Sequence, residues 1–195
     1  MPENTILKAI LDRRSTRSFT ADQISREALD LILQAAIWAP SGGNNQTWLF
    51  TAIQNKNILL QLNALAREAF ISRYVPDDDY PGKHGMKTAA QNDTFNFYKH
   101  APTLIIASNV PGYENAMADC SLALENVFLA AQSLGLGSCY INQLHWLQND
   151  AIIRDYLFTL GIPKEHTICN SAAIGYIDKP SSPPARKEGT INIIP

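Results

Sequence analysis

The chain contains 195 residues, 46% of them hydrophobic and 17% charged, and its formal net charge is −2. This composition is that of a folded globular protein and excludes an intrinsically disordered chain. The small negative charge excludes a broad positive field for nucleic acid or an anionic membrane, so any anion site must be local. A chain of this length is predicted to form one domain over residues 1–195.

The first half of the chain predicts three helices, one strand and a long irregular segment. Asn4 or Thr5 and, further on, Ser25 are good N-caps, and apolar residues recur at helical spacing after them. The predicted elements are a helix from 5 to 13, a helix from 26 to 39, a strand from 48 to 53, a helix from 58 to 74 and an irregular segment from 74 to 101. A connection as long as the last is uncommon inside a compact domain and often forms a lid or a binding loop.

The second half predicts strands and helices in irregular alternation. The predicted elements are a strand from 103 to 108, a helix from 115 to 134, a strand from 138 to 142, a helix from 150 to 160, a strand from 167 to 177 and an extended tail after 180. The helix from 115 to 134 is apolar almost all round, which is typical of a core or a subunit interface. Because strict β-α-β alternation is absent, we expect a mixed α/β (α+β) layered domain and not a doubly wound parallel sheet.

The cysteines and histidines indicate neither a metal site nor a disulfide framework. Cys120, Cys139 and Cys169 form no C-x-x-C pair, and the four histidines have no metal-ligand spacing. A small, odd number of cysteines fits a reducing cytosol. The first residues are polar and unlike a signal peptide, and no apolar run approaches the roughly 20 residues that cross a bilayer. We therefore expect a cytoplasmic protein with no metal, membrane or nucleic-acid partner.

Three guanidiniums and two hydroxyls follow the first helix within five consecutive residues. The segment is Arg13-Arg14-Ser15-Thr16-Arg17. Guanidinium forks match the oxygens of a phosphate, and hydroxyl groups add further donors. The same residues are also typical of a solvated basic turn, so the segment alone leaves an anion site and a plain surface turn open.

A second polar cluster fills the loop between the second helix and the first strand. Its residues are Pro40-Ser41-Gly42-Gly43-Asn44-Asn45-Gln46, followed by Thr47 and Trp48. Glycine lets the backbone approach a ligand closely, and the amides of Asn44 and Gln46 offer donors and acceptors to a heterocycle or a polyol. An ordinary helix-to-strand loop has a similar composition, so both interpretations stay open.

Two weaker signals lie in the C-terminal half. Residues 135–143 read G-L-G-S-C-Y-I-N-Q. They match a dinucleotide-binding fingerprint only in part, because Tyr140 breaks the pattern and a helix precedes it where a strand is required. A helix C-cap followed by a strand is the plainer interpretation. Arg186 and Lys187 form a basic pair in the Pro-rich tail, where such pairs are usually solvated.

Taken together and in this order, these features resemble the nitroreductase family of flavoproteins. The shared features are an N-terminal helix ending in R-R-S-T-R-S-F, the segment A-A-I-W-A-P-S-G-G-N-N-Q-T-W, the long apolar helix running into G-L-G-S, and an I-G-Y strand before a basic tail. The resemblance spans nearly the whole chain. The first two motifs are fairly specific as a pair, and the last two are weak alone.

The resemblance implies an FMN-dependent NAD(P)H oxidoreductase that reduces nitroaromatics, quinones or related electron-poor small molecules by a ping-pong mechanism. It implies a homodimer with FMN sites at the subunit interface, a central mixed, mainly antiparallel sheet flanked by helices, and a C-terminal tail exchanged across the dimer. No catalytic protein residue is expected, because flavin N5 carries the hydride. A non-catalytic flavin- or nucleotide-binding module, or a specialised flavin reaction such as flavin cleavage or dehalogenation, remains an alternative.

The resemblance also implies which residues hold the phosphate end of FMN and one edge of its ring. Arg13 and Ser15 would meet the phosphate, with Arg14 beside them. Arg17 would lie near N1 and O2 of the flavin, where a cation stabilises the negative charge that reduction adds. From the tail, Arg186 with Lys187 would close on the phosphate.

The remaining contacts implied by the resemblance come from two other segments. Asn44 and Gln46 would bind FMN from the other subunit, with Pro40 and Ser41 shaping their loop. Asn142 and the backbone of Gln143 would face the pyrimidine edge and N5. Two departures from the family pattern are Thr47, where proline is usual, and Asn142, where some members carry an acid, so its influence on the flavin stays open. Residues 74–100 match no pattern of the family.

Overall fold

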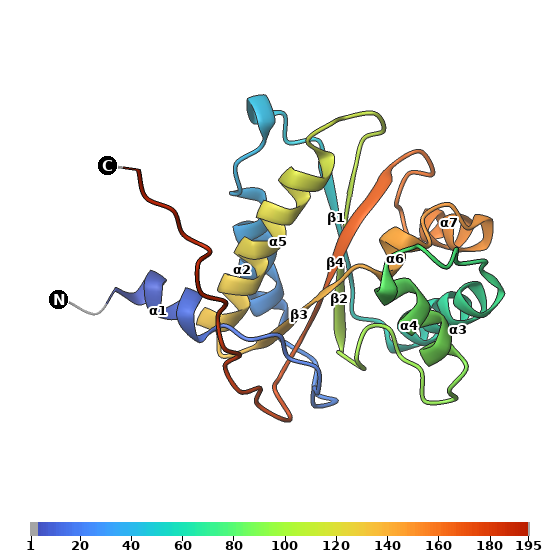
Figure 1. Cartoon of the computed structure of the whole chain (residues 1–195), viewed down its shortest axis with the longest axis horizontal. Coiled ribbons are helices and arrows are strands. Elements are labelled where there is room, and N and C mark those ends of the chain that lie inside the picture. The colour runs from blue at the N-terminus through green and yellow to red at the C-terminus, as the bar shows by residue number, and fades with distance from the viewer. Residues whose placement is uncertain (1–3, 195) are drawn as a thin grey trace.

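The computed structural model describes residues 4–194 and has a central sheet between two layers of helices (Figure 1). The strands are β1 (Trp48–Ile53), β2 (Thr103–Asn109), β3 (Gly137–Ile141) and β4 (Thr167–Gly175), in the spatial order β1-β2-β4-β3. All three neighbouring pairs are antiparallel. The predicted mixed, mainly antiparallel fold is confirmed, and an isolated bridge between Ser15 and Ser138 supplies a parallel contact.

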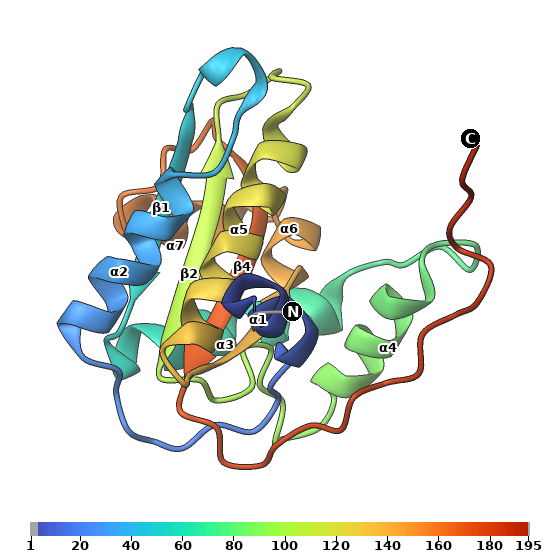
Figure 2. The same cartoon turned by 90° about the vertical axis from the view of Figure 1, so that its left-hand side faces the viewer.

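Two groups of helices cover the two faces of the sheet (Figures 1 and 2). One group contains α1, α2 and α5, and the other contains α3, α4, α6 and α7. Their bounds are α1 (Thr5–Asp12), α2 (Arg26–Ile37), α3 (Lys56–Ser72), α4 (Pro81–Ala90), α5 (Ala116–Ser133), α6 (Gln143–Trp146) and α7 (Ala151–Thr159), and a 3₁₀ turn, Gly42–Asn44, precedes β1.

The central strand β2 explains why the core has two halves. All seven of its residues are buried. Leu104 and Ile106 belong to the apolar cluster beneath α3 and α7, whereas Ile105 and Ala107 belong to the cluster beneath α2 and α5. Alternate side chains of a strand point to opposite faces, so a strand covered on both sides has apolar residues in succession, as in residues 104–107.

The helix starts follow from their caps. The side chain of Asn4 accepts hydrogen bonds from the N–H groups of Ile6 and Leu7, both at 3.1 Å. The Ser25 hydroxyl accepts one from the N–H of Ala28, also at 3.1 Å. These side chains satisfy donors that the first turn of a helix leaves unpaired. The predicted starts of α1 and α2 are therefore confirmed.

The prediction of an irregular segment over residues 74–101 is wrong in its centre, where Pro81–Ala90 forms α4. Proline suits the first turn of a helix, because the N–H that it lacks would be unpaired there. Two glycines lower the helix propensity and hide the periodic pattern. The helix is held by its packing on α3, where Arg67 Nε donates to the carbonyl of Ala90 at 2.8 Å. The four-residue α6 was also missed, because it is too short to show a period.

Replacing Gly137 by alanine is expected to destabilise the fold by about 1–3 kcal/mol. A Cβ at this position would lie 2.6 Å from Thr16 Oγ1, and Thr16 is itself buried. The matched control is Gly85→Ala in α4, where a Cβ would meet nothing within 4 Å and where alanine favours the helix. Urea unfolding measures both variants. Equal stability of the two would contradict the close packing of Thr16 on β3.

Candidate functional site

The segment that follows α1 runs alongside β3. Thr16 N donates to the carbonyl of Ser138 at 2.8 Å, and Ser15 and Ser138 form the parallel bridge. Gly137 permits this approach because it has no Cβ, and Gly135, with φ +72°, ends the preceding helix. The segment 13–17 and the segment 135–143 therefore lie side by side, and the C-cap interpretation of residues 135–137 is correct.

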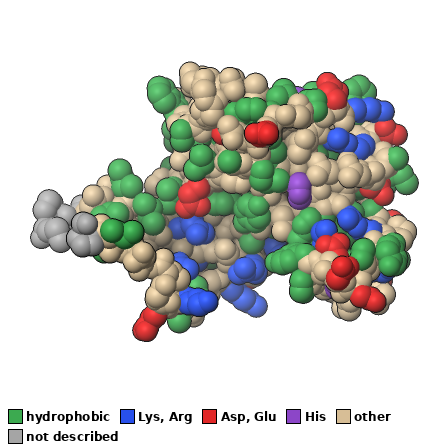
Figure 3. All heavy atoms as spheres, turned by 45° about the horizontal axis from the view of Figure 1, so that its top comes forward, with side chains coloured by type: hydrophobic (Ala, Val, Ile, Leu, Met, Phe, Trp, Pro, Cys, Tyr) green, Lys and Arg blue, Asp and Glu red, His purple; other side chains and the backbone are tan. Residues whose placement is uncertain are grey.

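The arginines of this segment surround a cavity of about 300 Å³, called here the arginine pocket. Its lining residues are Arg13, Arg14, Ser15, Arg17, Ser181, Ser182, Pro184 and Arg186. Figure 3 shows a group of Lys and Arg side chains in the lower left part of the view. Four guanidiniums that share one cavity repel one another, so an anion between them is stabilised.

Many N–H groups of these guanidiniums make no hydrogen bond within residues 4–194 and could donate to a ligand. Arg13 Nε lies 3.5 Å from Glu125 Oε1. Arg14 Nη1 donates to the carbonyls of Leu11 and Arg13, at 2.6 and 2.7 Å, in the last turn of α1. Arg17 is exposed and makes a long bond, 3.4 Å, to the carbonyl of Ser15. A guanidinium has five N–H donors, so most of them remain available to phosphate oxygens.

The tail after β4 completes the arginine pocket. Ser181 Oγ donates to the carbonyl of Ser15 at 3.1 Å, which places the start of the tail against the segment after α1. Arg186 then reaches the pocket from a part of the chain far away in sequence. Lys187 is exposed and does not line the pocket. The structure therefore brings Arg186 into the same pocket as Arg13, Arg14 and Arg17, and Lys187 stays outside it.

Asn142 and Gln143 lie where β3 ends and α6 begins. Asn142 occupies the N-cap position of α6, but its side chain makes no capping hydrogen bond. Gln143 is 8% exposed, and its Oε1 has no hydrogen-bond partner among residues 4–194. A buried acceptor without a partner is costly unless a ligand or water supplies a donor. The resemblance implied a role for the backbone of Gln143, and the structure identifies its side-chain Oε1 as a second candidate to contact a ligand.

Burial and positively charged side chains near β3 both influence the pKa of Cys139. Burial raises the pKa of its thiol, and the positive charges of Arg17, Lys99 and Arg13 partly oppose that rise. Lys99 is a basic residue of this region that sequence analysis missed. It is half-buried, and its φ of +60° is rare for a residue with a Cβ. Nothing in its sequence neighbourhood marks such a conformation.

The 40–46 loop lies at the opposite end of the molecule from the arginine pocket. In Figures 1 and 2 this loop is at the top, whereas the chain after α1 runs toward the bottom. Pro40, Asn44 and Gln46 are exposed and Ser41 is half-buried. Gln46 Nε2 donates to Asn44 Oδ1 at 3.0 Å. A single chain therefore does not bring Asn44 or Gln46 to the arginine pocket.

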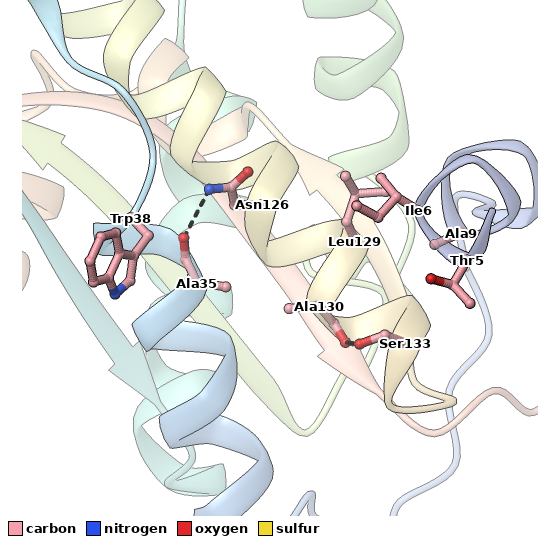
Figure 4. Close-up of a pocket in the computed structure, with 9 residues that line it drawn as sticks. All are labelled: Thr5, Ile6, Ala9, Ala35, Trp38, Asn126, Leu129, Ala130 and Ser133. Carbon is pink, nitrogen blue, oxygen red and sulfur yellow. Dashed lines mark hydrogen bonds between the residues drawn. The ribbon is translucent and has the colours of Figure 1, made fainter.

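An apolar groove of about 440 Å³ separates α1 from α2 and α5 (Figure 4). Its lining residues are Thr5, Ile6, Ala9, Ala35, Trp38, Asn126, Leu129, Ala130 and Ser133. Trp38 is 79% exposed, and α1 buries none of its residues. Large apolar side chains that gather on one surface commonly mark an interaction site.

Among residues 4–194, no helix combines the length and the apolar character needed to cross a lipid bilayer. Within the same residues, no group of three or more His, Cys, Asp or Glu side chains is arranged to hold a metal ion.

Comparison with known proteins identifies the family. A nitroreductase from Bacteroides fragilis, solved with bound FMN, is 39% identical with a TM-score of 0.89, and the match covers 98% of this chain and 99% of that one. A nitroreductase from Desulfitobacterium hafniense, also with bound FMN, is 25% identical with a TM-score of 0.83 and 98% coverage of both chains. An NADPH-flavin oxidoreductase from Vibrio harveyi is 28% identical over 90% of this chain and 67% of its own length. The nitroreductase family model matches residues 10–176, and the chain belongs to the nitroreductase family.

Proposed function

We propose that this protein is an FMN-dependent NAD(P)H oxidoreductase that reduces nitroaromatics, quinones or related electron-poor small molecules. The observation that carries the proposal is the arginine pocket, because four guanidiniums and three serine hydroxyls around about 300 Å³ suit a phosphate monoester. The FMN bound by the relatives from B. fragilis and D. hafniense favours FMN over other phosphate ligands. The name of the V. harveyi relative supports a nicotinamide as the electron donor.

The residues present fit FMN at both of its ends. Arg13 and Ser15, with Arg14 beside them and Arg186 from the tail, would hold the phosphate. Arg17 would lie near N1 and O2 of the ring, which agrees with its electrostatic influence on Cys139 of β3. Lys187 would add only long-range positive charge.

The edge of the ring would meet the end of β3. The unpartnered Oε1 of Gln143 is an acceptor that a ring N–H of FMN would satisfy. The side chain of Asn142, which caps no helix N–H, would lie beside it. Lys99, near the same strand, would add positive charge to this part of the site.

FMN, when bound, would supply the hydride chemistry between NADH or NADPH and the acceptor, and the kinetic scheme that we propose is ping-pong. The protein therefore has to bind, orient and stabilise charge, and needs no acid, base or nucleophile of its own. Arg17 would stabilise the negative charge that reduction adds at N1 and O2, and this contribution is larger where water is excluded.

We propose a homodimer as the functional unit. Asn44 and Gln46 of one subunit would complete the FMN site of the other, with Pro40 and Ser41 shaping the loop. The partner would cover the apolar groove, and the tail would be exchanged across the dimer. Two features support this: the distance of the loop from the arginine pocket within one chain, and the apolar surface that a single chain leaves exposed. The proposed compartment is the cytoplasm, since all three cysteines are free and buried.

The identity of the cofactor is tested by denaturing the purified protein and separating the released flavin by chromatography. We expect one FMN per subunit and no FAD, because the arginine pocket suits a terminal phosphate. Release of FAD would show that the pocket holds a different phosphate group. A protein that carries no flavin and takes up no added FMN would contradict the proposed function.

A further inference from the structure

A buried carboxylate outside the arginine pocket holds the 40–46 loop. Asp119 lies in the first turn of α5 and is 3% exposed. Gly42 N donates to the carboxylate, with both Oδ atoms at 3.2 Å, and the Tyr113 hydroxyl donates to Oδ2 at 2.9 Å. Asp119 forms no salt bridge with any cation among residues 4–194. Its oxygens therefore accept from a backbone N–H and a phenol, and we call Asp119 and Tyr113 the loop anchor.

The loop is seated tightly on this anchor. The carbonyl oxygen of Gly42 lies 3.1 Å from the Tyr113 hydroxyl, so both polar groups of the Gly42 backbone face the anchor. A Cβ at Gly42 would lie 2.3 Å from Asn115 Nδ2 and 2.7 Å from the Tyr113 hydroxyl oxygen. Glycine therefore permits this close approach, since a Cβ would displace Asn115 or Tyr113, and its φ angle is not the reason.

The residues beyond Gly42 hold backbone conformations that need support. Asn44 has φ +55° and Gln46 has φ +50°, both in the left-handed region. Residues with a Cβ stay in such conformations only where the surrounding structure holds them. Gln46 N donates to Ser41 Oγ at 3.1 Å inside the loop. In the described part of the chain, the polar contacts that tie this exposed loop to α5 and to the segment before it are those of the Gly42 backbone with the loop anchor.

We propose that the loop anchor is a positioning device for the cofactor. Asp119 and Tyr113 preset the 40–46 loop so that Asn44 and Gln46 are presented to the FMN of the partner subunit, an inference that rests on the proposed function. Neither anchor residue lines the arginine pocket. A loop without its anchor must become ordered when FMN binds, and that loss of conformational freedom weakens the affinity.

The test compares FMN dissociation constants of dimers reconstituted from the flavin-free protein. Asp119→Ala is expected to weaken FMN binding about tenfold or more, as for other lost charge-assisted hydrogen bonds. Asp119→Asn keeps an oxygen that accepts from Gly42 N–H, and its affinity is expected to stay within about threefold of the wild type. Tyr113→Phe removes only the hydroxyl and should have an intermediate effect. Hydrogen exchange of the amides of residues 41–47, measured without FMN, should be faster in Asp119→Ala.

The matched control is Asp150→Ala. Asp150 also accepts a backbone N–H, that of Ile153 at 3.0 Å, but it caps α7 on the other side of the sheet. This variant should lower the thermal stability and leave FMN affinity unchanged, which separates positioning from general destabilisation. Sedimentation confirms that each variant is still a dimer.

Several results would overturn the inference. If Asp119→Ala binds FMN as tightly as the wild type, or if Asp119→Asn is as weak as Asp119→Ala, the anchor does not position the loop. In the double variant of Asp119→Ala with Gln46→Ala, the loss in FMN binding free energy should be smaller than the sum of the losses in the two single variants. In the double variant of Asp119→Ala with Arg13→Ala, the loss should equal that sum. Additivity in both pairs would contradict action through the loop. A wild-type protein that binds no FMN overturns the proposed function as well, whereas tight binding by wild type and Asp119→Ala alike overturns this inference alone.

Discussion

A chain that ends at residue 179 is expected neither to dimerise nor to retain FMN. The truncation removes Ser181 and Arg186 from the arginine pocket. It also removes three isoleucines that are 81–86% exposed in the single chain and that we expect the partner to cover. Permanent dimers typically bury more than about 2,000 Å², and FMN that binds only the dimer must stabilise it. Sedimentation velocity, with flavin absorbance followed on the same boundary, measures both losses together.

Arg186→Ala in the full-length chain separates the role of the tail in FMN binding from its role in dimer formation. It should weaken FMN binding by about 10- to 150-fold, the equivalent of about 1.5–3 kcal/mol for one charge-assisted hydrogen bond, and leave the dimer intact. A truncated protein that remains a dimer and keeps its FMN would show that the tail is dispensable. A full-length monomer with stoichiometric FMN would contradict a site shared between subunits.

Arg17→Ala is expected to lower the two-electron potential of bound FMN and to slow its reduction by NADH or NADPH. The removed charge would lie beside N1 and O2, where reduction adds negative charge, and one such bond contributes about 1.5–3 kcal/mol. Because Arg17 is exposed, solvent screening should bring the effect to the lower end of that range. A redox titration of the fully loaded variant, combined with stopped-flow reduction, measures both quantities.

Two arginines serve as controls for that experiment. Arg13→Ala should weaken FMN binding while the potential of the flavin that still binds stays near the wild-type value, because Arg13 is assigned to the phosphate. Arg26, on α2, pairs with Asp30 at 2.8 Å on the exposed surface, so Arg26→Ala should change neither quantity. An unchanged potential in fully loaded Arg17→Ala would contradict its placement near the ring.

Local signals in the sequence were sufficient for most of the fold. Caps such as Asn4 and Ser25 mark helix starts, and an uninterrupted apolar run marks β2, because these features depend on nearby residues alone. α4 was missed because Gly82 and Gly85 lower its helix propensity and packing on α3 holds the helix. Helix propensity predicts a helix poorly where tertiary contacts determine whether the helix forms.

The residues of the candidate site that belong to local sequence motifs could be predicted, and those brought in by long-range packing could not. Arg13, Arg17 and Arg186 were identified as candidates, yet only the fold shows that the tail returns to the segment after α1. Lys99 could not be found, since its left-handed φ and its nearness to Cys139 depend on long-range packing. Asp119 lies in a mainly apolar helix, and the residues around it in the sequence do not indicate that it accepts a hydrogen bond from the distant Gly42.

The most direct test of the proposed oxidoreductase is an anaerobic stopped-flow experiment on the FMN-loaded dimer. NADH and NADPH are added separately while the visible flavin band is followed, and a nitroaromatic or a quinone is then mixed in. We expect at least one nicotinamide to bleach the band and the oxidant to restore it, as a ping-pong sequence requires. A flavin band that both nicotinamides leave unchanged would contradict the enzyme and favour a non-catalytic flavin-binding module.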